Sequence, residues 1–238
     1  MSQLVVVKFG GSSLASLELI QNCAEKALKH YPSVVVVSAM GKTTDDLQNK
    51  LSYFSSKEEI INDFTLSSGE QVSAGLFAAA LESKGQKAWP ICGWQLPIKT
   101  EKKNIISVGT TKIIELLSKG YTPVITGFQG IGKDGAISTL TRGGSDVTAI
   151  AVAAALSVDC YIYTDVDGVY EVDPRLEYTK NQKFVQISHD QMLNMSLAGA
   201  KVLHPEAVRI AKENKIKIHV KSSFKDTLGT IIEDRLAT

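Results

Sequence analysis

Two short apolar runs rich in β-branched residues stand out near the start of the chain. Residues 4–7 and 34–37 are apolar throughout, and the segment between them has helical spacing at Leu17, Ile20, Ala24, Ala27, Leu28 and Tyr31. This pattern predicts a βαβ unit. Strands that are apolar on both faces are typical of a parallel sheet covered by helices on each side, so we predict the α/β class.

The same alternation of helix and strand patterns continues along the chain. Helices are predicted over 69–83, 110–119 and 145–156, with two more before a last strand over 216–220, and the other strands over 87–91, 123–126 and 161–163. No repeat or low-complexity tract interrupts the pattern. We expect a single domain over 1–238, with an N-terminal half of about 1–120 and a C-terminal half of about 121–238.

Composition and charge exclude several classes of protein. The 238 residues are 44% hydrophobic, enough to bury a full core, and 26 Lys and Arg against 25 Asp and Glu give a net charge of +1. The chain has no run of Lys and Arg residues of the kind that would indicate a nucleic-acid partner. The start of the chain does not have the pattern of a leader sequence. No apolar run approaches the roughly 18 residues that a membrane span needs. We therefore expect a cytoplasmic protein without nucleic-acid or membrane partners.

Cysteines and histidines give no sign of a metal site. Cys23, Cys92 and Cys160 lie in apolar surroundings without a C-x-x-C spacing, which is typical of reduced thiols, and the four histidines form no H-x-x-x-H pair. We expect no metal held by protein ligands alone, so any metal should arrive with a substrate.

Residues 8–13, KFGGSS, follow the first predicted strand. Open α/β sheets bind ligands at the carboxyl ends of their strands. Gly10 and Gly11 let backbone N–H groups approach an anion, and Lys8 supplies a positive charge, a combination that suits phosphate. Taken alone, the segment fits an ordinary turn with an exposed lysine equally well.

Residues 127–134, GFQGIGKD, nearly match the phosphate loop G-x-x-x-x-G-K-[ST]. Asp134 stands where a magnesium-binding hydroxyl is required, and residues 136–140 have the pattern of an extended segment and not of a helix. We therefore reject the match. The order of the glycines also differs from the dinucleotide fingerprint, which disfavours a Rossmann dehydrogenase.

Residues 141–149, TRGGSDVTA, precede the alanine-rich helix. Ser145 is a candidate N-cap, and the glycines before it can present N–H donors to an anion at the positive helix end. Arg142 is suited to binding a carboxylate bidentately. Asp146 either stabilises the helix dipole, the usual role of such an acid, or binds an ammonium group or orients Lys8.

Residues 163–175 follow a strand and combine aromatic, hydroxyl, carboxylate and guanidinium groups. This combination can enclose a nucleoside and its phosphates. The alternative is an acidic surface loop with an Asp-Pro turn. An EF-hand is excluded, because the required ligand spacing does not follow the D-x-D-G start.

Together these segments resemble the amino-acid kinase superfamily and, within it, the aspartate kinases. The resemblance runs from Val5 to about Ile232. It rests on KFGGSS at 8–13, VSAMGKTTDDL at 37–47, SSGEQVSA at 67–74, GWQ at 93–95, GFQG at 127–130, RGGSDVTA at 142–149, TDVDGVYEVDPR at 164–175 and GAKVLHPEAV at 199–208. RGGSD and TDVDGVY together separate aspartate kinases from uridylate, glutamate and carbamate kinases of the same fold.

The resemblance implies a three-layer αβα sandwich with a mainly parallel central sheet. It implies ATP-dependent phosphorylation of the side-chain carboxylate of L-aspartate to 4-phospho-L-aspartate, the first step toward lysine, threonine, methionine and diaminopimelate. Aspartate is expected toward the N-terminal half and ATP toward the C-terminal half, with Mg²⁺ held mainly by the nucleotide phosphates.

Site residues follow from the same resemblance. The catalytic pair is Lys8 and Asp146. The nucleotide side comprises Lys8, Phe9, Gly10, Gly11, Ser38, Ser145, Thr164, Asp165, Tyr170, Arg175 and Lys201. The acceptor side comprises Thr43, Thr44, Glu70, Arg142, Gly143 and Gly144, with Arg142 on the α-carboxylate of aspartate and Glu70 near its ammonium.

Departures from the family pattern keep two alternatives open. Thr141 replaces a usual glycine, Ser12 a usual threonine, and the segment after Gln95 is short. Thr141 together with the short segment after Gln95 favours a kinase of the same fold that acts on an aspartate analogue. No ACT regulatory region is recognised, which favours a non-catalytic module that binds aspartate or nucleotide. A homodimer is expected for the superfamily, and a separate ACT-containing subunit is a further expectation.

Overall fold

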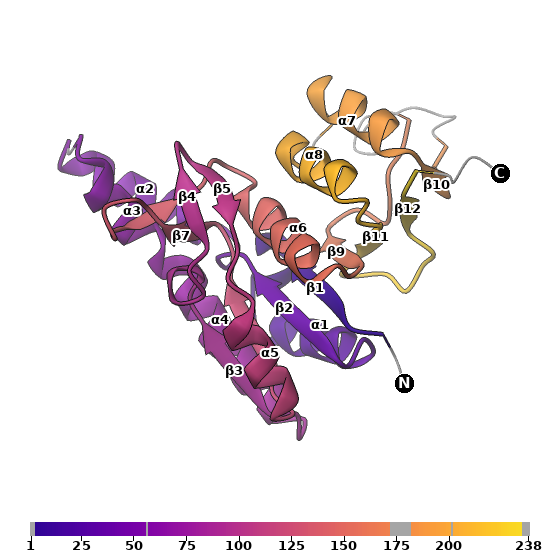
Figure 1. The fold of residues 1–238 in the computed structure, drawn as a ribbon, viewed down its shortest axis with the longest axis horizontal. Helices are drawn as coiled ribbons and strands as arrows, with labels where there is room; N and C mark the ends of the chain where they lie inside the picture. The colour runs from indigo at the N-terminus through magenta and orange to yellow at the C-terminus, as the bar shows by residue number, and fades with distance from the viewer. Residues whose placement is uncertain (1–2, 56, 172–181, 201, 235–238) are drawn as a thin grey trace.

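The computed structural model describes residues 3–55, 57–171, 182–200 and 202–234. Figure 1 shows a central sheet with helices on both sides. Its strands, in spatial order, are β10 (Gln186–Ile187), β12 (Thr230–Ile232), β11 (Ile218–Ser222), β9 (Cys160–Thr164), β1 (Val5–Phe9), β2 (Ser33–Val37), β6 (Thr122–Thr126) and β3 (Ala88–Ile91). All neighbouring pairs are parallel except β11 and β12, so the predicted mainly parallel sheet is confirmed.

Helices cover both faces of this sheet. One face carries α1 (Leu17–Leu28) and α4 (Ser68–Glu82), and the other carries α5 (Thr111–Ser118), α6 (Gly144–Leu156), α7 (His189–Leu197) and α8 (Pro205–Glu213). Alternate residues of β1 enter two separate apolar cores, because successive side chains of a strand point to opposite faces: Val5 and Val7 join the α1 and α4 core, and Val6 joins the α6 core. The predicted three-layer αβα sandwich is confirmed.

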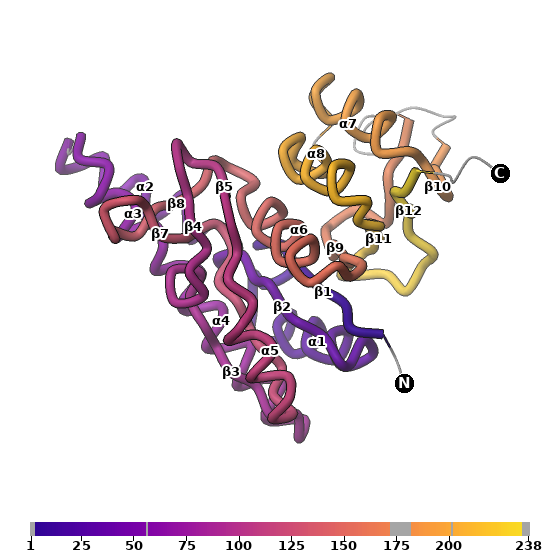
Figure 2. Tube along the Cα trace, in the orientation of Figure 1, coloured from indigo at the N-terminus to yellow at the C-terminus, as the bar shows by residue number. Residues whose placement is uncertain are grey.

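A second, smaller sheet and two helices were not predicted. The sheet has the order β5 (Asn104–Ser107), β4 (Lys99–Glu101), β7 (Gln129–Ile131) and β8 (Ile137–Thr139). Helices α2 (Thr43–Tyr53) and α3 (Glu59–Leu66) lie with it, at the end of the molecule opposite α7 and α8 (Figures 1 and 2). Short 3-10 turns η1 (Gly11–Leu14) and η2 (Gly93–Gln95) complete the described elements.

The segment that imitates a phosphate loop is part of the smaller sheet. Residues 127–134 run through β7 into a turn, and β8 pairs antiparallel with β7. No helix begins there, so the rejection of the phosphate-loop match is confirmed. Strand β6 follows the predicted boundary at 120 yet lies between β2 and β3, so one sheet runs through both predicted halves and their separation stays a prediction.

The described residues bear on two predictions, about membrane-spanning segments and about the state of the cysteines. None of the described helices has the length and apolarity needed to cross a bilayer. All three cysteines are free, with Cys23 and Cys160 buried and Cys92 partly buried. Burial raises the pKa of the Cys23 thiol to about 12, so this thiol stays protonated at neutral pH.

Candidate active site

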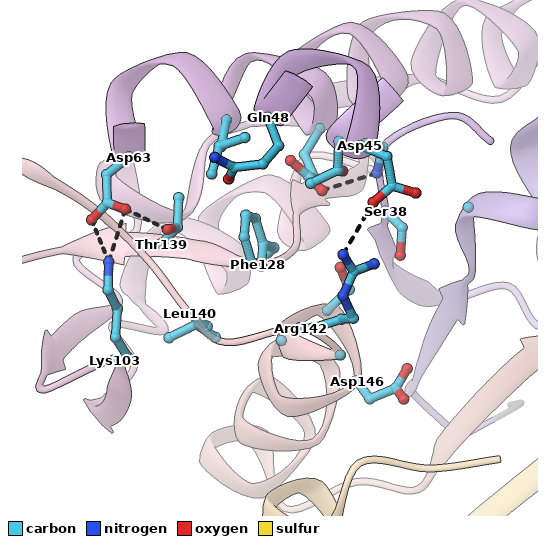
Figure 3. Close-up of a pocket in the computed structure, with 18 of the residues that line it drawn as sticks. Ser38, Asp45, Gln48, Asp63, Lys103, Phe128, Thr139, Leu140, Arg142 and Asp146 are labelled. Atoms are coloured by element: carbon cyan, nitrogen blue, oxygen red, sulfur yellow. Dashed lines mark hydrogen bonds and ion pairs between the residues drawn. The ribbon is translucent and has the colours of Figure 1, made fainter. Parts of the chain in front are cut away.

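A cleft of about 530 Å³ opens at the carboxyl ends of β1 and β2. Its floor includes Lys8, Gly11 and Ser38, and its walls come from α2, α3, the start of α4, the smaller sheet and the start of α6 (Figure 3). This is the edge at which open α/β sheets bind ligands.

Lys8 forms a buried ion pair on the floor of the cleft. It shares a face of β1 with Val6, the face that α6 covers, and its Nζ lies 2.6 Å from Asp146 Oδ1 in the first turn of α6. The two side chains are only 9% and 12% exposed. The alternative of an exposed lysine in an ordinary turn is therefore excluded. Asp146 also meets the positive end of the helix dipole, so the carboxylate has two sources of stabilisation.

Gly11 allows the loops after β1 and β2 to touch. Its carbonyl accepts a hydrogen bond from the Gly41 amide at 2.9 Å. A Cβ on Gly11 would lie 2.7 Å from the Ala39 carbonyl oxygen, closer than real contacts allow. The Gly10 amide donates to the Tyr163 carbonyl at 3.2 Å, so this N–H is already used within the protein.

Helix α6 begins earlier than predicted. Its N-cap is Gly143, whose φ of 86° is left-handed, so Ser145 lies inside the first turn and the predicted Ser145 cap is wrong. A Cβ on Gly143 would lie 2.8 Å from the His204 ring, and one on Gly144 would lie 2.6 Å from Leu140 Cβ. The two glycines thus start the helix where bulkier residues would not fit, and residues 142–146 line the cleft.

Glu70 is a buried carboxyl group with one oxygen unoccupied. It lies in the first turn of α4 and is 2% exposed. Oε1 accepts from the Ala39 amide at 3.0 Å, whereas Oε2 has no hydrogen-bond partner among the described residues. Burial raises the pKa of Glu70 to about 7, against the smaller lowering effect of the bond from Ala39. A ligand donor such as an ammonium group would satisfy Oε2 and favour ionisation.

Arg142 and Asp45 face each other across the mouth of the cleft (Figure 3). Their Nη2 and Oδ1 atoms lie 3.1 Å apart, and the Arg142 side chain is 88% exposed. An exposed pair of this kind contributes little stability, so the guanidinium can exchange partners readily. Thr44 also lines the cleft, whereas Thr43 begins α2 and lies beside Gly69.

The wall of the cleft opposite Asp146 contains residues that the sequence analysis missed (Figure 3). Asp63, Lys103 and Thr139 form a hydrogen-bonded group there, and Phe128 lies between them and Arg142 (Figure 3). The sequence of α3 gives no signal that marks Asp63, because its neighbours Ile60, Ile61 and Phe64 are exposed and only Asp63 and Leu66 of this helix are buried.

Lys8, Gly11, Ser38 and Ser145, four of the residues predicted for the nucleotide side, line the cleft. Thr164, Asp165 and Tyr170 are not among the residues that line the cleft: Thr164 ends β9, which neighbours β1, and the other two follow it in the loop. Phe9 is fully buried and its ring stacks on Tyr163 at 5.1 Å between centroids, so only its backbone is placed to meet a ligand. Arg175 and Lys201 lie outside the described residues.

Hydrogen bonds order the loop after β9. The Thr164 hydroxyl donates to Asp165 at 3.2 Å, and the Tyr170 hydroxyl donates to Asp167 at 2.7 Å. The bond to Asp167 raises the pKa of Tyr170 to about 12.

In the parts of the chain that the structure describes, no group of three or more His, Cys, Asp and Glu side chains is arranged to hold a metal ion.

Comparison with known proteins identifies the family to which the chain belongs. The sequence model of the amino acid kinase family matches residues 3–222. The chain belongs to the amino acid kinase family. The fold that was predicted from the resemblance is therefore the fold of the family to which the chain belongs.

Within this family the chain is similar to aspartokinases. It is 44% identical to the aspartokinase of Geobacillus stearothermophilus, over 98% of this chain and 60% of that protein. It is 46% identical to aspartokinase 2 of Bacillus subtilis, over 97% of this chain and 59% of that protein. The chain thus spans about 60% of the length of these curated relatives.

A solved structure agrees with this similarity. The aspartate kinase from Synechocystis superposes with a TM-score of 0.88 at 39% identity, covering 98% of this chain and 40% of that chain. The amino-acid kinase fold therefore holds across the sheet, both helical layers and the walls of the cleft.

Proposed function

We propose that the chain transfers the terminal phosphoryl group of ATP to the side-chain carboxylate of L-aspartate. The observation that carries the proposal is that one cleft holds both a buried, paired Lys8 and the buried Glu70 with an unoccupied oxygen. The first suits a transferring phosphoryl group, and the second suits the ammonium of an amino acid. Identities of 44% and 46% to aspartokinases support aspartate as the acceptor.

The reaction needs positioning more than it needs a base. The β-carboxylate of aspartate is ionised at neutral pH, so one of its oxygens can attack the γ-phosphorus directly. The new P–O bond forms as the bond to the β,γ-bridging oxygen breaks, which gives 4-phospho-L-aspartate and ADP. Lys8 would neutralise charge on the moving group, Asp146 would hold Lys8 in place, and Lys201 is proposed to assist.

Glu70 and Arg142 are proposed to hold the acceptor. Glu70 would accept from the α-ammonium through Oε2, and Arg142 would exchange Asp45 for the α-carboxylate. Thr43, Thr44 and the glycines at the start of α6 complete the acceptor side. This assignment divides the acceptor contacts between the two proposed halves, with Thr43, Thr44 and Glu70 in the N-terminal half and Arg142, Gly143 and Gly144 in the C-terminal half.

The nucleotide is proposed to lie along the end of β9. Thr164, Asp165, Tyr170, Arg175 and Lys201 are its proposed contacts, with Ser38 and Ser145 on the side of the cleft. Mg²⁺ commonly binds through one or two carboxylates, waters and substrate phosphates. Because the described residues offer no cluster of ligands for it, we assign the ion to the phosphates of ATP.

The expected setting of the reaction is part of the proposal. The chain would act in the cytoplasm as a homodimer and supply the first intermediate toward lysine and threonine. A separate ACT-containing subunit stays a prediction.

A coupled ADP-release assay tests the proposed reaction. Aspartate, glutamate, UMP and no acceptor are compared, and hydroxylamine traps any acyl phosphate. We expect ADP release and a hydroxamate with aspartate alone. Turnover with an aspartate analogue in place of aspartate would instead indicate a kinase of the same fold that acts on such an analogue. Binding of aspartate or ATP without turnover would show a non-catalytic module.

A further inference from the structure

Asp63 is the centre of a buried polar network on the wall of the cleft opposite Asp146 (Figure 3). It lies near the end of α3 and is 5% exposed. Both of its carboxylate oxygens accept from Lys103 Nζ at 2.8 Å, and Oδ1 also accepts from the Thr139 hydroxyl at 2.5 Å (Figure 3). Hydrogen bonds to a buried carboxylate are among the strongest in proteins.

The network joins three elements that are distant in sequence. Asp63 belongs to α3 and Thr139 ends β8. Lys103 is in the turn between β4 and β5, with a left-handed φ of 64°, and its Nζ also lies 2.7 Å from Glu59. Burial opposes the charge of Lys103, but the hydrogen bonds that its ammonium donates to the carboxylates of Asp63 and Glu59 outweigh this effect and raise the pKa of Lys103.

Two of these elements lead directly to the proposed acceptor residues. Strand β8 ends at Thr139, and the chain continues through two residues to Arg142. Helix α3 meets α4 at Ser67, and Glu70 follows in the first turn of α4. A second bond crosses the same junction, since the Gln129 side-chain amide donates to the Ser67 carbonyl at 2.8 Å. Asp63 thus links the backbone that carries Glu70 to the backbone that carries Arg142.

We propose that Asp63 is a positioning residue, which sets the separation of Glu70 and Arg142 through Thr139 and Lys103 and thereby sets the affinity for the amino-acid acceptor. This inference rests on the proposed function, because it assigns acceptor binding to those two residues. Binding groups must be held within about 0.5 Å of their productive positions, and a buried, charged and fully paired carboxylate is suited to that task.

Different substitutions detach different elements from the network. Thr139→Val keeps the shape of the side chain but removes the hydroxyl that bonds β8 to Asp63. This substitution therefore releases the strand that leads to Arg142. Lys103→Met removes the cation, so the Asp63 carboxylate is left buried with Thr139 alone. Asp63→Asn in the Lys103→Met background restores a neutral acceptor for Thr139. We therefore expect the double variant to recover part of what Lys103→Met loses.

Steady-state kinetics of the whole chain test the proposal. Thr139→Val and Lys103→Met should raise the KM for aspartate at least about tenfold, while kcat and the KM for ATP stay within about twofold. Lys103→Arg should keep most of the wild-type affinity because it retains the charge. Lys102→Met is the matched control, since Lys102 is an exposed lysine in the same turn. Equal rises of both KM values, no rise in either variant, or the same rise in the control would overturn the proposal.

Hydrogen exchange separates this proposal from the proposed function. Thr139→Val and Lys103→Met should speed amide exchange in residues 137–146 and leave α8 unchanged, whether or not the chain turns over aspartate. If wild-type chain phosphorylates no acid, the proposed function fails, and exchange still decides whether Asp63 positions this segment. Unchanged exchange in residues 137–146 of both variants would overturn the positioning role.

Discussion

The Lys8 ammonium and the Asp146 carboxylate lie 2.6 Å apart where β1 meets the first turn of α6. Each group neutralises the other in a place with little access to water, so neither can be removed alone without cost. The pair also fixes the direction of the Lys8 side chain before any ligand arrives. Preorganised charge of this kind is what phosphoryl transfer requires.

Lys8→Met should abolish turnover while leaving nucleotide binding largely intact. The substitution removes the proposed charge stabilisation of the transferring group, so we expect kcat to fall at least about 10²-fold and the Kd for ATP to change far less. It also leaves Asp146 buried without its cation, which should lower the free energy of unfolding by about 3 kcal/mol. Single-turnover kinetics, calorimetry and urea unfolding measure these quantities.

The double variant Lys8→Met with Asp146→Asn is the control for that experiment. It removes both charges, so stability should return while turnover stays lost. Equal losses of kcat and of nucleotide affinity in Lys8→Met would contradict a role in the transition state.

Glu70 should make both stability and acceptor binding depend on pH. Burial raises its pKa from 4.5 to about 7 in the folded chain, so the folded chain holds this proton more tightly than the unfolded chain does. Its contribution to stability is therefore complete below about pH 4.5 and is lost as pH rises through about 7, on the order of 3 kcal/mol in all. The KM for aspartate should fall over the same rise, because ionised Glu70 attracts an ammonium group.

Glu70→Gln should remove this pH dependence. Urea unfolding at pH 5.5 and pH 8 should show a smaller difference than in the wild type, and the KM for aspartate should be high at both. Glu82→Gln is the matched control, since Glu82 is an exposed acid at the end of the same helix, α4. A wild-type pH profile that persists in Glu70→Gln would assign the titration to another group.

Gly11→Ala should disrupt the floor of the cleft. The added Cβ would lie 2.7 Å from the Ala39 carbonyl oxygen, so the loops after β1 and β2 must separate. We expect a loss of stability of about 1–3 kcal/mol and a larger loss of kcat/KM, measured by urea unfolding and steady-state kinetics. Gly75→Ala in α4 is the opposite case, because nothing lies within 4 Å of the new Cβ. It should stabilise the chain by about 0.5–1 kcal/mol.

Arg142→Gln should weaken acceptor binding without destabilising the chain. Its guanidinium is 88% exposed and its pair with Asp45 is a surface pair, so unfolding should change by less than about 1 kcal/mol. The KM for aspartate should rise at least about tenfold, because the proposed bidentate contact to the α-carboxylate is lost. Arg142→Lys should rescue little, since lysine lacks the planar fork. Full rescue by lysine would show that charge alone matters.

The central layers could be predicted because their sequences carry strong signals. Strands β1 and β2 are buried along their whole length and are apolar except at Lys8 and Ser33, and α6 is rich in alanine because it lies directly against β1. The smaller sheet could not be predicted. Its strands are short, and β5 is mostly exposed, so neither length nor alternation distinguishes it from a loop. The polar helix α2 was missed because Leu51 is its only buried residue, so no apolar stripe with helical spacing marks it.

The site was predictable where chemistry and local sequence coincide. Lys8, Asp146 and Glu70 stand in recognisable segments, and the structure brings all three to one cleft. The Asp63 network could not be predicted from the sequence, because the pairing of short strands is what brings Thr139 and Lys103 to Asp63. The start of α6 was misjudged for a different reason, since the left-handed Gly143 replaces the expected serine cap.

The alternation of β1 between two cores has an evolutionary consequence. Val5 and Val7 pack with α1 and α4, whereas Val6 packs with α6 on the other side of the sheet. Contacts that share no neighbours contribute nearly independently to stability. Adjacent positions of one strand therefore accept substitutions under separate constraints, and in a set of homologues Val6 should covary with residues of α6 while its two neighbours covary with the opposite layer.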